Sequence, residues 1–323
     1  MKAIVYESYG SPEVLQLKEV AKPIPKDHEL LIKVKATTVT VADVRARGFI
    51  VPRAFWLPAR ISLGMTKPKK EILGMEVAGV VEAVGKQVKT FNIGDEVFAA
   101  TLVNFGGYAE YICLPENGPV SLKPSNATFE EAAAIPIGAR TALFFLRKAN
   151  IKPGQQVLVY GASGSVGTYA VQLANYFGAH VTGICSTKNK IVVKSLGADK
   201  VIDYTKEDFS KDGTKYDVIF EAVDKSSFST CIDSLKEGGT YINITPPLPD
   251  MKMIWAKITS GKRVILSQNS PETAEALVFL KSLFEEEKLK AVIDQTYTMQ
   301  EIRKAHHYVE KGHKVGNVVL TIE

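Results

Sequence analysis

Residues 156 to 174 contain the feature that most limits what this chain can fold into. A short apolar run, Gln156-Val-Leu-Val-Tyr160, leads directly into the glycine-rich turn Gly161-Ala-Ser-Gly-Ser-Val-Gly167, which leads into the helical sequence from Thr168 to Ala174. Glycines in such a turn let the backbone bend tightly and let the following helix pack closely on the sheet. The N–H groups at the start of the helix can face an anion. This order of strand, turn and helix predicts a parallel sheet with a phosphate-binding turn.

The spacing of small residues in the turn matches the dinucleotide-binding fingerprint. Ala162, Gly164 and Gly167 take its three positions, with alanine at the first. A match of this kind gains weight when βαβ units follow, and strand-like and helix-like segments alternate from His180 to Leu266. The alternative is a glycine-rich turn that serves packing alone. The residues assigned to a cofactor in this turn are Ala162, Ser163, Gly164, Ser165, Val166 and Gly167.

The region around this turn lacks acidic residues. An NAD-specific site usually has an Asp or Glu about 20 residues downstream that binds the ribose 2′-hydroxyl. Here no Asp or Glu occurs between residues 132 and 198, although the chain has 35 of them. A 2′-phosphate would be repelled by an acid and held by hydroxyl and ammonium groups. We therefore expect NADPH, held by Ser186, Thr187 and one of Lys188 and Lys190; the alternative is that these lysines only begin a solvated helix.

Composition and length exclude several classes of protein. The chain has 323 residues, of which 46% are hydrophobic and 23% charged, as in folded proteins of two domains. Its net charge of +5 is small and dispersed, so no nucleic-acid partner is expected. Cys113, Cys185 and Cys231 are odd in number and far apart, which excludes a disulfide framework. The start does not resemble a signal peptide and no long apolar span occurs, so we expect a cytoplasmic protein with no membrane partner.

The first 125 residues are typical of β structure, with short β-branched runs such as Glu29 to Ala36 between turn residues. After Lys123-Pro124 the pattern changes to alternating strands and helices. Residues 48 to 70 lose clear periodicity but hold several aromatic and basic side chains. That segment is either mobile over a pocket or a peripheral packed loop.

Taken together, the motifs resemble the medium-chain dehydrogenase/reductase superfamily, and within it the zinc-independent quinone oxidoreductase branch, over essentially the whole chain. The matching pieces are Met1-Lys-Ala-Ile-Val with Gly10-Ser-Pro-Glu-Val-Leu15, Gly74-Met-Glu-Val-Ala-Gly79, Gly94-Asp-Glu-Val-Phe98, Gly107-Tyr-Ala-Glu-Tyr111, the fingerprint, and Gly312-His-Lys-Val-Gly-Asn-Val-Val-Leu320. The resemblance implies an α/β protein: residues 1–125 and 268–323 form a GroES-like β-rich catalytic domain, and residues 126–267 form an inserted Rossmann domain, a doubly wound parallel sheet. It also implies a homodimer through the Rossmann edge strand Arg263 to Leu266.

The resemblance also assigns site residues. Zinc-dependent relatives bind catalytic zinc through a Cys and through the His of a Gly-His-Glu motif; here Thr40 or its neighbourhood replaces the Cys and Met75 replaces the His. Zinc selects thiolate and imidazole, so no metal is expected, and the five histidines are interpreted as surface or packing residues. Thr40 and Arg45 are candidates for substrate positioning, although Arg45 can equally form a surface or domain salt bridge. The family further implies Thr141 near the nicotinamide, Tyr204 near the adenosine phosphate, and Asn317 in the tail segment that returns to the cofactor.

The expected function is hydride transfer. Without a metal to polarise an alkoxide, reduction of an electron-poor acceptor remains. We therefore expect an NADPH-dependent, zinc-independent oxidoreductase that reduces quinones or α,β-unsaturated carbonyls. Two alternatives stay open: an enoyl-thioester reductase, with basic residues between 53 and 70 at the mouth of a pantetheine channel, or a non-catalytic dinucleotide-binding protein of the crystallin-like or RNA-binding kind. The sequence leaves the natural acceptor open.

Overall fold

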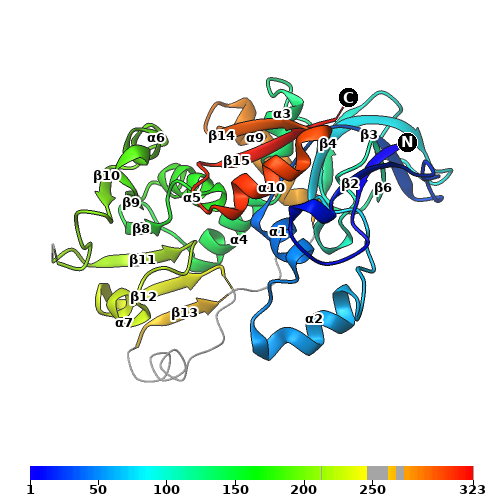
Figure 1. Cartoon of the computed structure of the whole chain (residues 1–323). Helices are drawn as coiled ribbons and strands as arrows, with labels where there is room; N and C mark the ends of the chain where they lie inside the picture. The colour runs from blue at the N-terminus through cyan, green and yellow to red at the C-terminus, as the bar shows by residue number, and fades with distance from the viewer. Residues whose placement is uncertain (212, 246–260, 267–272, 323) are drawn as a thin grey trace. The chain divides into compact units, whose positions relative to one another are not determined.

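The computed structural model of the chain describes residues 1–211, 213–245, 261–266 and 273–322 (Figure 1). These residues fold into two compact units. The strand-rich unit comprises the described residues of Met1–Ile137, Glu272–Glu287 and Ala291–Glu323, and the parallel-sheet unit those of Gly138–Pro271 and Lys288–Lys290. The sequence predicts the first boundary after residue 125, whereas the strand-rich unit continues to residue 137 because helix α3 (Phe129–Ala133) packs on β3, β4, β5 and β15 of that unit. The expected boundary after residue 267 lies outside the described residues.

A seven-stranded sheet forms the centre of the strand-rich unit, in the order β14-β15-β3-β4-β5-β7 with β6 also paired to β3. The long strand β3 pairs with β4 along one edge, and with β6 and then β15 along the other. Because β15 comes from the end of the chain, this pairing joins both ends of the sequence in one sheet. The strands are β3 (Glu29–Thr38), β4 (Glu76–Val84), β5 (Glu96–Ala100), β6 (Tyr111–Pro115), β7 (Val120–Leu122), β14 (Ile293–Thr298) and β15 (Asn317–Thr321), and β1 (Lys2–Val5) pairs separately with β2 (Gln16–Glu19).

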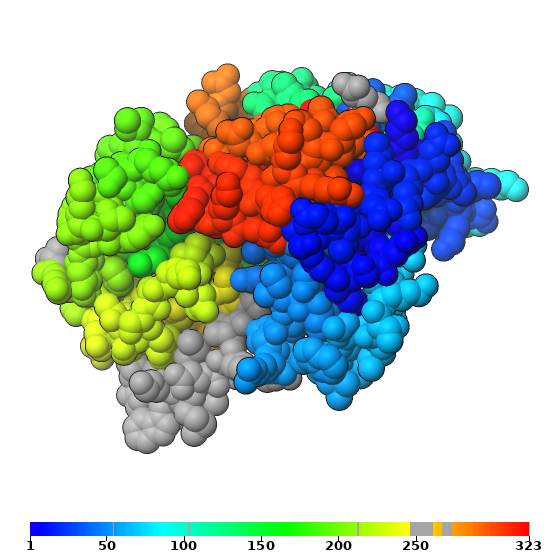
Figure 2. Space-filling model, in the orientation of Figure 1, coloured from blue at the N-terminus to red at the C-terminus, as the bar shows by residue number. Residues whose placement is uncertain are grey.

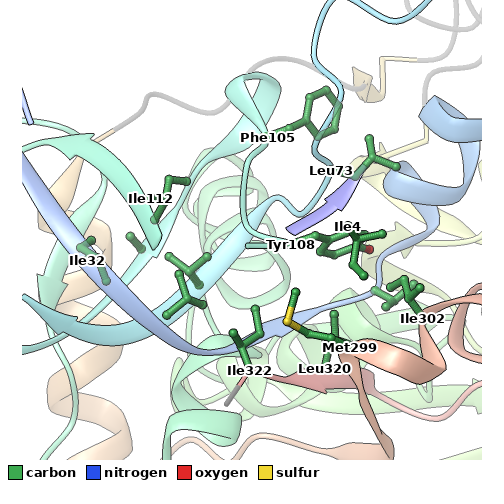
Figure 3. Packing of buried hydrophobic residues seen from close by; sticks show 14 of the residues in the cluster. Ile4, Ile32, Leu73, Phe105, Tyr108, Ile112, Met299, Ile302, Leu320 and Ile322 are labelled. Atoms are coloured by element: carbon green, nitrogen blue, oxygen red, sulfur yellow. The ribbon is translucent and has the colours of Figure 1, made fainter. Parts of the chain in front are cut away.

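Apolar side chains from both ends of the chain share one core in this unit. From Ile32 to Ala36 of β3 the apolar residues are buried and the lysines between them are half-buried, as expected where one face of a strand is buried. In Figure 3, Ile4 of β1, Ile32 of β3 and Leu320 of β15 belong to the same cluster. This shared core explains why the C-terminal tail folds with the N-terminal strands rather than with the segment that precedes it.

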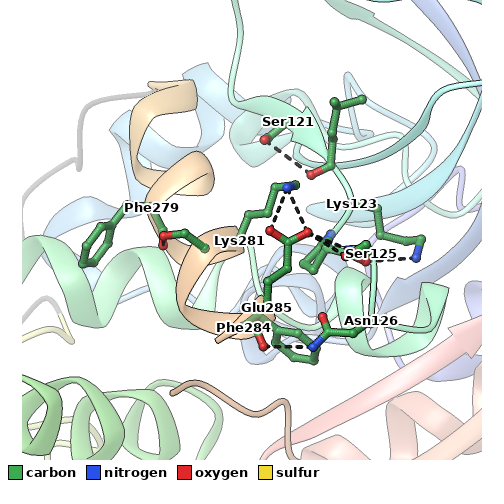
Figure 4. A network of polar contacts seen from close by, with 11 residues as sticks. Ser121, Lys123, Ser125, Asn126, Phe279, Lys281, Phe284 and Glu285 are labelled. Atoms are coloured by element: carbon green, nitrogen blue, oxygen red, sulfur yellow. Dashed lines mark hydrogen bonds and ion pairs between the residues drawn. The ribbon is translucent and has the colours of Figure 1, made fainter. Parts of the chain in front are cut away.

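Helix α9 (Ala274–Glu285) confirms the helical face that periodicity predicts over residues 273 to 287, and it packs against β7. Its Lys281 and Glu285 form an ion pair at 2.8 Å, and Glu285 also accepts hydrogen bonds from the backbone N–H and the hydroxyl of Ser125, at 2.9 and 3.0 Å (Figure 4). These bonds attach the helix to the segment that follows β7.

The parallel-sheet unit contains a six-stranded, fully parallel sheet in the order β10-β9-β8-β11-β12-β13. The chain runs outward from β8 to β10, returns to β11 beside β8, and then continues to β13. This reversal between β8 and β11 is the topological switch point at which doubly wound sheets bind ligands. The strands are β8 (Gln156–Tyr160), β9 (His180–Cys185), β10 (Lys200–Asp203), β11 (Tyr216–Glu221), β12 (Leu235–Asn243) and β13 (Arg263–Leu266), with helices α4 (Gly138–Ala149), α5 (Ser165–Tyr176), α6 (Lys190–Ser195) and α7 (Phe228–Asp233).

Residues 48 to 70, for which the sequence predicts a loop, contain helical structure. The 3-10 turn η2 (Arg53–Phe55) leads into helix α2 (Trp56–Leu63), which follows α1 (Val41–Gly48) in the chain. Pro58 obscures this helix in the sequence, but it lies in the first turn, where a missing N–H costs no intrahelical bond. Among the described residues, no helix combines the length and apolar character needed to cross a bilayer.

Candidate functional site

The glycine-rich turn after β8 differs in one respect from the sequence expectation. The fingerprint spacing assigns the tight turn to Ala162, but it is Gly161 that adopts the left-handed conformation, with a φ of +79°. Ala162 is fully buried, and its N–H donates to the carbonyl of Ile184 in β9 at 2.9 Å. The turn therefore begins one residue earlier than expected, and Ala162 serves to connect the two strands.

Gly164 and Gly167 have separate roles at the start of α5. A Cβ atom at Gly167 would lie 2.0 Å from the carbonyl oxygen of Gly161, so only glycine lets the helix approach the turn. Gly164 is the N-cap of α5 and supplies no side-chain hydrogen bond. Helix geometry also leaves the amides of Val166 and Gly167 without an acceptor inside the helix. These amides and the positive end of the helix dipole can receive a pyrophosphate.

Asn189, a residue that the sequence did not single out, joins the segment after β9 to this turn. It ends the 3-10 turn η4 (Thr187–Asn189), which the half-buried Ser186 precedes. The buried side-chain amide of Asn189 donates to the hydroxyl of Ser163 at 2.9 Å. The structure thus brings Ser163 together with the 186–189 segment. No spacing rule could have identified Asn189, because its partner lies in another strand turn.

An acidic side chain lies in the same cluster. Asp203, at the end of β10, accepts hydrogen bonds from the hydroxyl of Thr187 and from the backbone N–H and hydroxyl of Thr205, the latter two at 3.0 and 2.7 Å. These bonds, that from Thr187 first, lower the pKa of Asp203 to about 2. The Thr187 hydroxyl donates to this carboxylate, so it offers a ligand its oxygen rather than its hydrogen. Asp203 lies after the acid-free interval from 132 to 198 in the sequence. It reaches this cluster because β10 pairs with β9 in the sheet.

The cationic candidates lie beside these strand ends. Lys188 is exposed in η4, and Lys190 is half-buried at the first position of α6. Tyr204 directly follows β10, and its side chain is exposed. Two ammonium groups and an aromatic ring are therefore within the same pair of strand turns as Ser186 and Thr187.

Thr141 and Asn317 belong to different units. Thr141 is half-buried in the first half of α4, in the parallel-sheet unit. Asn317 begins β15 in the strand-rich unit, is buried, and donates its side-chain amide to the carbonyl of Val292 at 3.1 Å. Through this hydrogen bond, Asn317 connects the start of β15 to the backbone at Val292 within its own unit.

The strand-rich unit places Thr40 against Met75. Thr40 is the N-cap of α1 and forms a capping box with Asp43: the Thr40 hydroxyl donates to the Asp43 carboxylate at 2.6 Å, and the Asp43 N–H donates back to the Thr40 oxygen at 3.1 Å. The Thr40 Oγ1 lies 3.8 Å from the Met75 Sδ. The two residues that the family resemblance equates with zinc ligands are thus adjacent here, and they carry a hydroxyl and a thioether. These groups do not fit the thiolate and imidazole that zinc selects.

Behind Thr40 lies a buried chain of polar side chains that links α1 to α10 (Ile302–Glu310). The Tyr108 hydroxyl interacts with the Asp43 carboxylate and lies 3.3 Å from the His306 Nε2. The His306 Nδ1 in turn accepts from the Arg47 guanidinium at 3.2 Å, and Arg47 also pairs with Glu310. Burial lowers the pKa of His306 to about 3, so the ring is neutral and its Nε2–H donates to Tyr108. His306 therefore packs in the interior, one of the two roles expected of the histidines.

Two further charged residues complete this part of the unit. Arg45 is exposed on α1, in contrast to Arg47, which is 1% exposed. Glu76 is buried, accepts from the Thr38 hydroxyl, and accepts from the Ile137 N–H at 2.7 Å. Burial raises the pKa of Glu76 to about 7 and that of Asp43 to about 6. The sequence reasoning did not identify Asp43, Glu76 or Tyr108, because burial rather than residue type makes them unusual.

Two family models match the chain. The alcohol dehydrogenase GroES-like domain matches residues 26–124, and the zinc-binding dehydrogenase domain matches residues 196–320. The first match covers most of the strands of the strand-rich unit. The second begins directly after α6 and ends within β15.

Relatives of known name match almost the whole chain. The 2-methylene-furan-3-one reductase of Solanum lycopersicum is 35% identical over 99% of this chain and 79% of its own length. The chloroplastic NADPH-dependent alkenal/one oxidoreductase of Arabidopsis thaliana is 32% identical, with the same two coverages. Among solved structures, the quinone oxidoreductase from Coxiella burnetii superposes with a TM-score of 0.89 at 30% identity, covering 100% of this chain and 99% of that one.

Proposed function

The chain belongs to the medium-chain dehydrogenase/reductase superfamily and is an oxidoreductase, and we propose that it uses NADPH to reduce quinones or α,β-unsaturated carbonyls without zinc. The observation that carries the proposal is the contact between Thr40 and Met75 at the two positions where zinc-dependent relatives supply thiolate and imidazole. A hydroxyl and a thioether do not hold a Lewis acid that would stabilise an alkoxide. The reaction that needs no such acid is hydride addition to an acceptor that is already electron-poor.

The residues of the glycine-rich turn and of the β9 and β10 turns fit a dinucleotide cofactor. The turn from Gly161 to Gly167 leaves backbone amides for the pyrophosphate, and the β9 and β10 turns offer Ser186, Lys188 and Lys190 for the adenosine end. When bound, the reduced nicotinamide supplies a hydride. The names of the relatives agree with this choice, since one is an NADPH-dependent alkenal/one oxidoreductase.

The preference for NADPH over NADH is tested by the two lysines. The carboxylate oxygens of Asp203 accept hydrogen bonds from the hydroxyls of Thr187 and Thr205. The carboxylate is therefore satisfied without a hydrogen bond from the ribose 2′-hydroxyl of NADH. Replacing both Lys188 and Lys190 by Gln removes the ammonium groups, and each charge-assisted hydrogen bond is worth roughly 1.5–3 kcal/mol. Calorimetry should therefore show NADPH affinity reduced at least ~10-fold with NADH affinity unchanged. Equal losses for both coenzymes, or tighter binding of NADH by the unaltered protein, would contradict the assignment.

Thr40 and Asp43 can also place a proton. While Asp43 is ionised, the Thr40 hydroxyl donates to it at 2.6 Å and has no hydrogen to offer a substrate oxygen. When Asp43 carries a proton at Oδ2, it can donate to Thr40, whose hydrogen is then free for the reduced acceptor. Since burial raises the pKa of Asp43 to about 6, we expect kcat/KM to rise as the pH falls towards that value. Thr40→Val should remove this rise of kcat/KM at lower pH. An unchanged dependence of kcat/KM on pH would exclude Thr40 and Asp43 as the proton source.

The reaction itself is tested by NADPH oxidation with a panel of acceptors: 1,4-benzoquinone, 9,10-phenanthrenequinone, short enones and enoyl-CoA. We expect turnover of quinones or enones by protein whose zinc content, measured by elemental analysis, is far below one ion per chain. Preference for enoyl-CoA would favour the enoyl-thioester reductase. Tight NADPH binding with no turnover would favour a non-catalytic role. Stoichiometric zinc that is required for turnover would overturn the mechanism.

Two further proposals come from kinship and composition. We propose a homodimer that pairs through β13, which is an edge strand of the described parallel sheet. We also propose a cytoplasmic location, which suits a chain whose three cysteines, Cys113, Cys185 and Cys231, are all free thiols.

A further inference from the structure

Large apolar side chains are concentrated on the surface formed by residues 50 to 65. Within these residues, six of them are exposed by 41% or more of their area, and they form what we call the α2 patch: Ile50, Phe55, Trp56, Leu57, Ile61 and Met65. Figure 2 shows this part of the chain, in blue to light blue, at the molecular surface. Isolated exposed apolar residues are ordinary, but a group of six around one short helix indicates an interaction surface.

Helix α2 has no buried residue, yet it is held in a defined orientation. Its inner face is attached through Arg60, whose guanidinium lies 3.8 Å from the centre of the Phe49 ring and 4.9 Å from that of Tyr9. Arg60 also donates to the Met65 carbonyl at 3.1 Å. These contacts fix which face points inward.

The outer face of α2 is consequently apolar and exposed. Leu57 and Ile61 are four residues apart, so they lie on the same side of the helix, and they are 56% and 59% exposed. Trp56 is 48% exposed although its ring packs edge-on against Phe49. Leu63 packs partly buried against the core of the unit, but the outer apolar face contributes little to stability unless something else covers it.

The charged residues within the segment that carries the α2 patch all have one sign. Between residues 44 and 70 the sequence contains no Asp or Glu. The exposed cations here are Arg45, Arg53, Lys67, Lys69 and Lys70. This segment therefore combines exposed apolar side chains, a tryptophan and several exposed cations.

We propose that the α2 patch docks on the surface of an anionic lipid bilayer. Short helices with Trp, Phe and Leu on one side and Lys or Arg around them bind the interface of membranes, where the apolar groups enter the headgroup boundary and the cations attract anionic lipid. A second copy of the chain is the less suitable partner, because a symmetric contact through this patch would place the cations of both copies opposite each other.

The proposal revises the sequence expectation that the protein has no membrane partner. That expectation rested on the absence of a spanning segment, and interfacial binding needs none. Docking is independent of the proposed reductase activity, since it is measured without coenzyme or acceptor. A protein that docks but reduces neither quinones nor enones would refute the proposed function and leave this inference intact.

The test is co-sedimentation of the full chain with large vesicles of phosphatidylcholine alone or with 30% phosphatidylglycerol. We expect binding to the anionic vesicles, at least ~10-fold weaker binding to neutral ones, and release by 0.5 M NaCl. The variant Leu57→Ser/Ile61→Ser should lose at least ~10-fold in partitioning, because it removes two side chains that enter the interface. Lys67→Gln/Lys69→Gln/Lys70→Gln should lose on the order of 100-fold, about five-fold for each charge.

Matched controls remove similar groups elsewhere. Ile24→Ser replaces an 87% exposed apolar residue, and Lys86→Gln/Lys89→Gln removes exposed lysines outside the patch. Both should bind vesicles as the unaltered protein does, and circular dichroism should show all variants folded. Failure of the unaltered protein to bind anionic vesicles would overturn the proposal, as would full binding by the Leu57→Ser/Ile61→Ser variant. A concentration-dependent dimer that this variant abolishes, without vesicle binding, would identify the patch as a contact between copies instead.

Discussion

Replacing Arg47 by Met is expected to destabilise the strand-rich unit by about 3 kcal/mol. The guanidinium is 1% exposed and donates to the Gly10 carbonyl at 3.1 Å, to His306 at 3.2 Å, and to Glu310. Methionine fills much of the same volume but donates no hydrogen bond, so three acceptors lose their partner. Breaking a buried ion pair costs roughly 3–5 kcal/mol, and the lower end applies because the Glu310 side chain is 31% exposed and water can solvate it.

Thermal unfolding followed by circular dichroism measures this loss. For a unit of this size, each kcal/mol corresponds to a shift in Tm of roughly 2–4 °C, so we expect Arg47→Met to melt about 6–12 °C lower. Arg45→Met is the matched control, because Arg45 lies two residues earlier on the same helix and is exposed. Its Tm should change by no more than ~2 °C, since surface substitutions usually fall within about 0.5 kcal/mol.

The double variant Arg47→Met/Glu310→Gln separates the ion pair from the packing. If the charge left on Glu310 causes much of the loss, then Glu310→Gln should recover at least ~1 kcal/mol in the Arg47→Met background. An Arg47→Met protein that melts within 1 °C of the unaltered protein would refute the reasoning that this guanidinium is held by partners that water cannot replace.

Three other predictions follow from the same geometry. Gly167→Ala places a Cβ 2.0 Å from the Gly161 carbonyl oxygen, so calorimetry should show NADPH affinity lowered by at least ~100-fold; Gly164→Ala, whose Cβ would meet that oxygen at 3.5 Å, should lose less, and the opposite order would contradict the assignment. Burial raises the pKa of Glu76 from 4.5 to about 7, so the folded state binds this proton more tightly than the unfolded state, and about 3 kcal/mol of stability present below pH 4.5 is lost as the pH rises to 7. Between pH 6 and 7, urea unfolding of Glu76→Gln should show a smaller loss of stability than the unaltered protein and the exposed-site control Glu286→Gln show. Identical slopes for all three proteins would exclude Glu76 as the source. Sedimentation should give a mass twice that of the 35.3 kDa chain, and a mass of one chain would exclude the dimer.

Local sequence patterns were sufficient for the parallel-sheet unit. The limits of β8 and β13 agree with those predicted, and α5 (Ser165–Tyr176) contains the helical sequence that follows the glycine-rich turn. Strand and helix periodicities, and the spacing of glycines at a turn, act over a few neighbouring residues and can be read without knowing the fold. The same patterns assigned the tight turn to Ala162, one residue too late. Spacing alone does not show which of two adjacent small residues adopts the positive φ, and in the structure it is Gly161.

Local patterns were insufficient for α2. The lack of periodicity favoured a loop, whereas the segment contains a helix that aromatic rings hold through Arg60. The stacking of Arg60 on Phe49 and Tyr9 requires three segments of the chain to come together in the fold. The spacing of hydrophobic residues within one segment does not predict such a contact. Composition did indicate that aromatic and basic residues are concentrated there.

The sequence by itself predicted the superfamily, which the relatives confirm, and it also predicts a dinucleotide turn and the replacement of the zinc-binding residues, because each of these is recorded in residue types at fixed spacing. Only the tertiary structure decided which side chains are buried together. Arg47 and His306 meet because β15 pairs with β3, which brings the tail into the N-terminal core. Asp203 reaches Thr187 because β10 lies beside β9. Burial sets the protonation of His306 and hydrogen bonding that of Asp203, and both depend on pairings between strands that are distant in the chain.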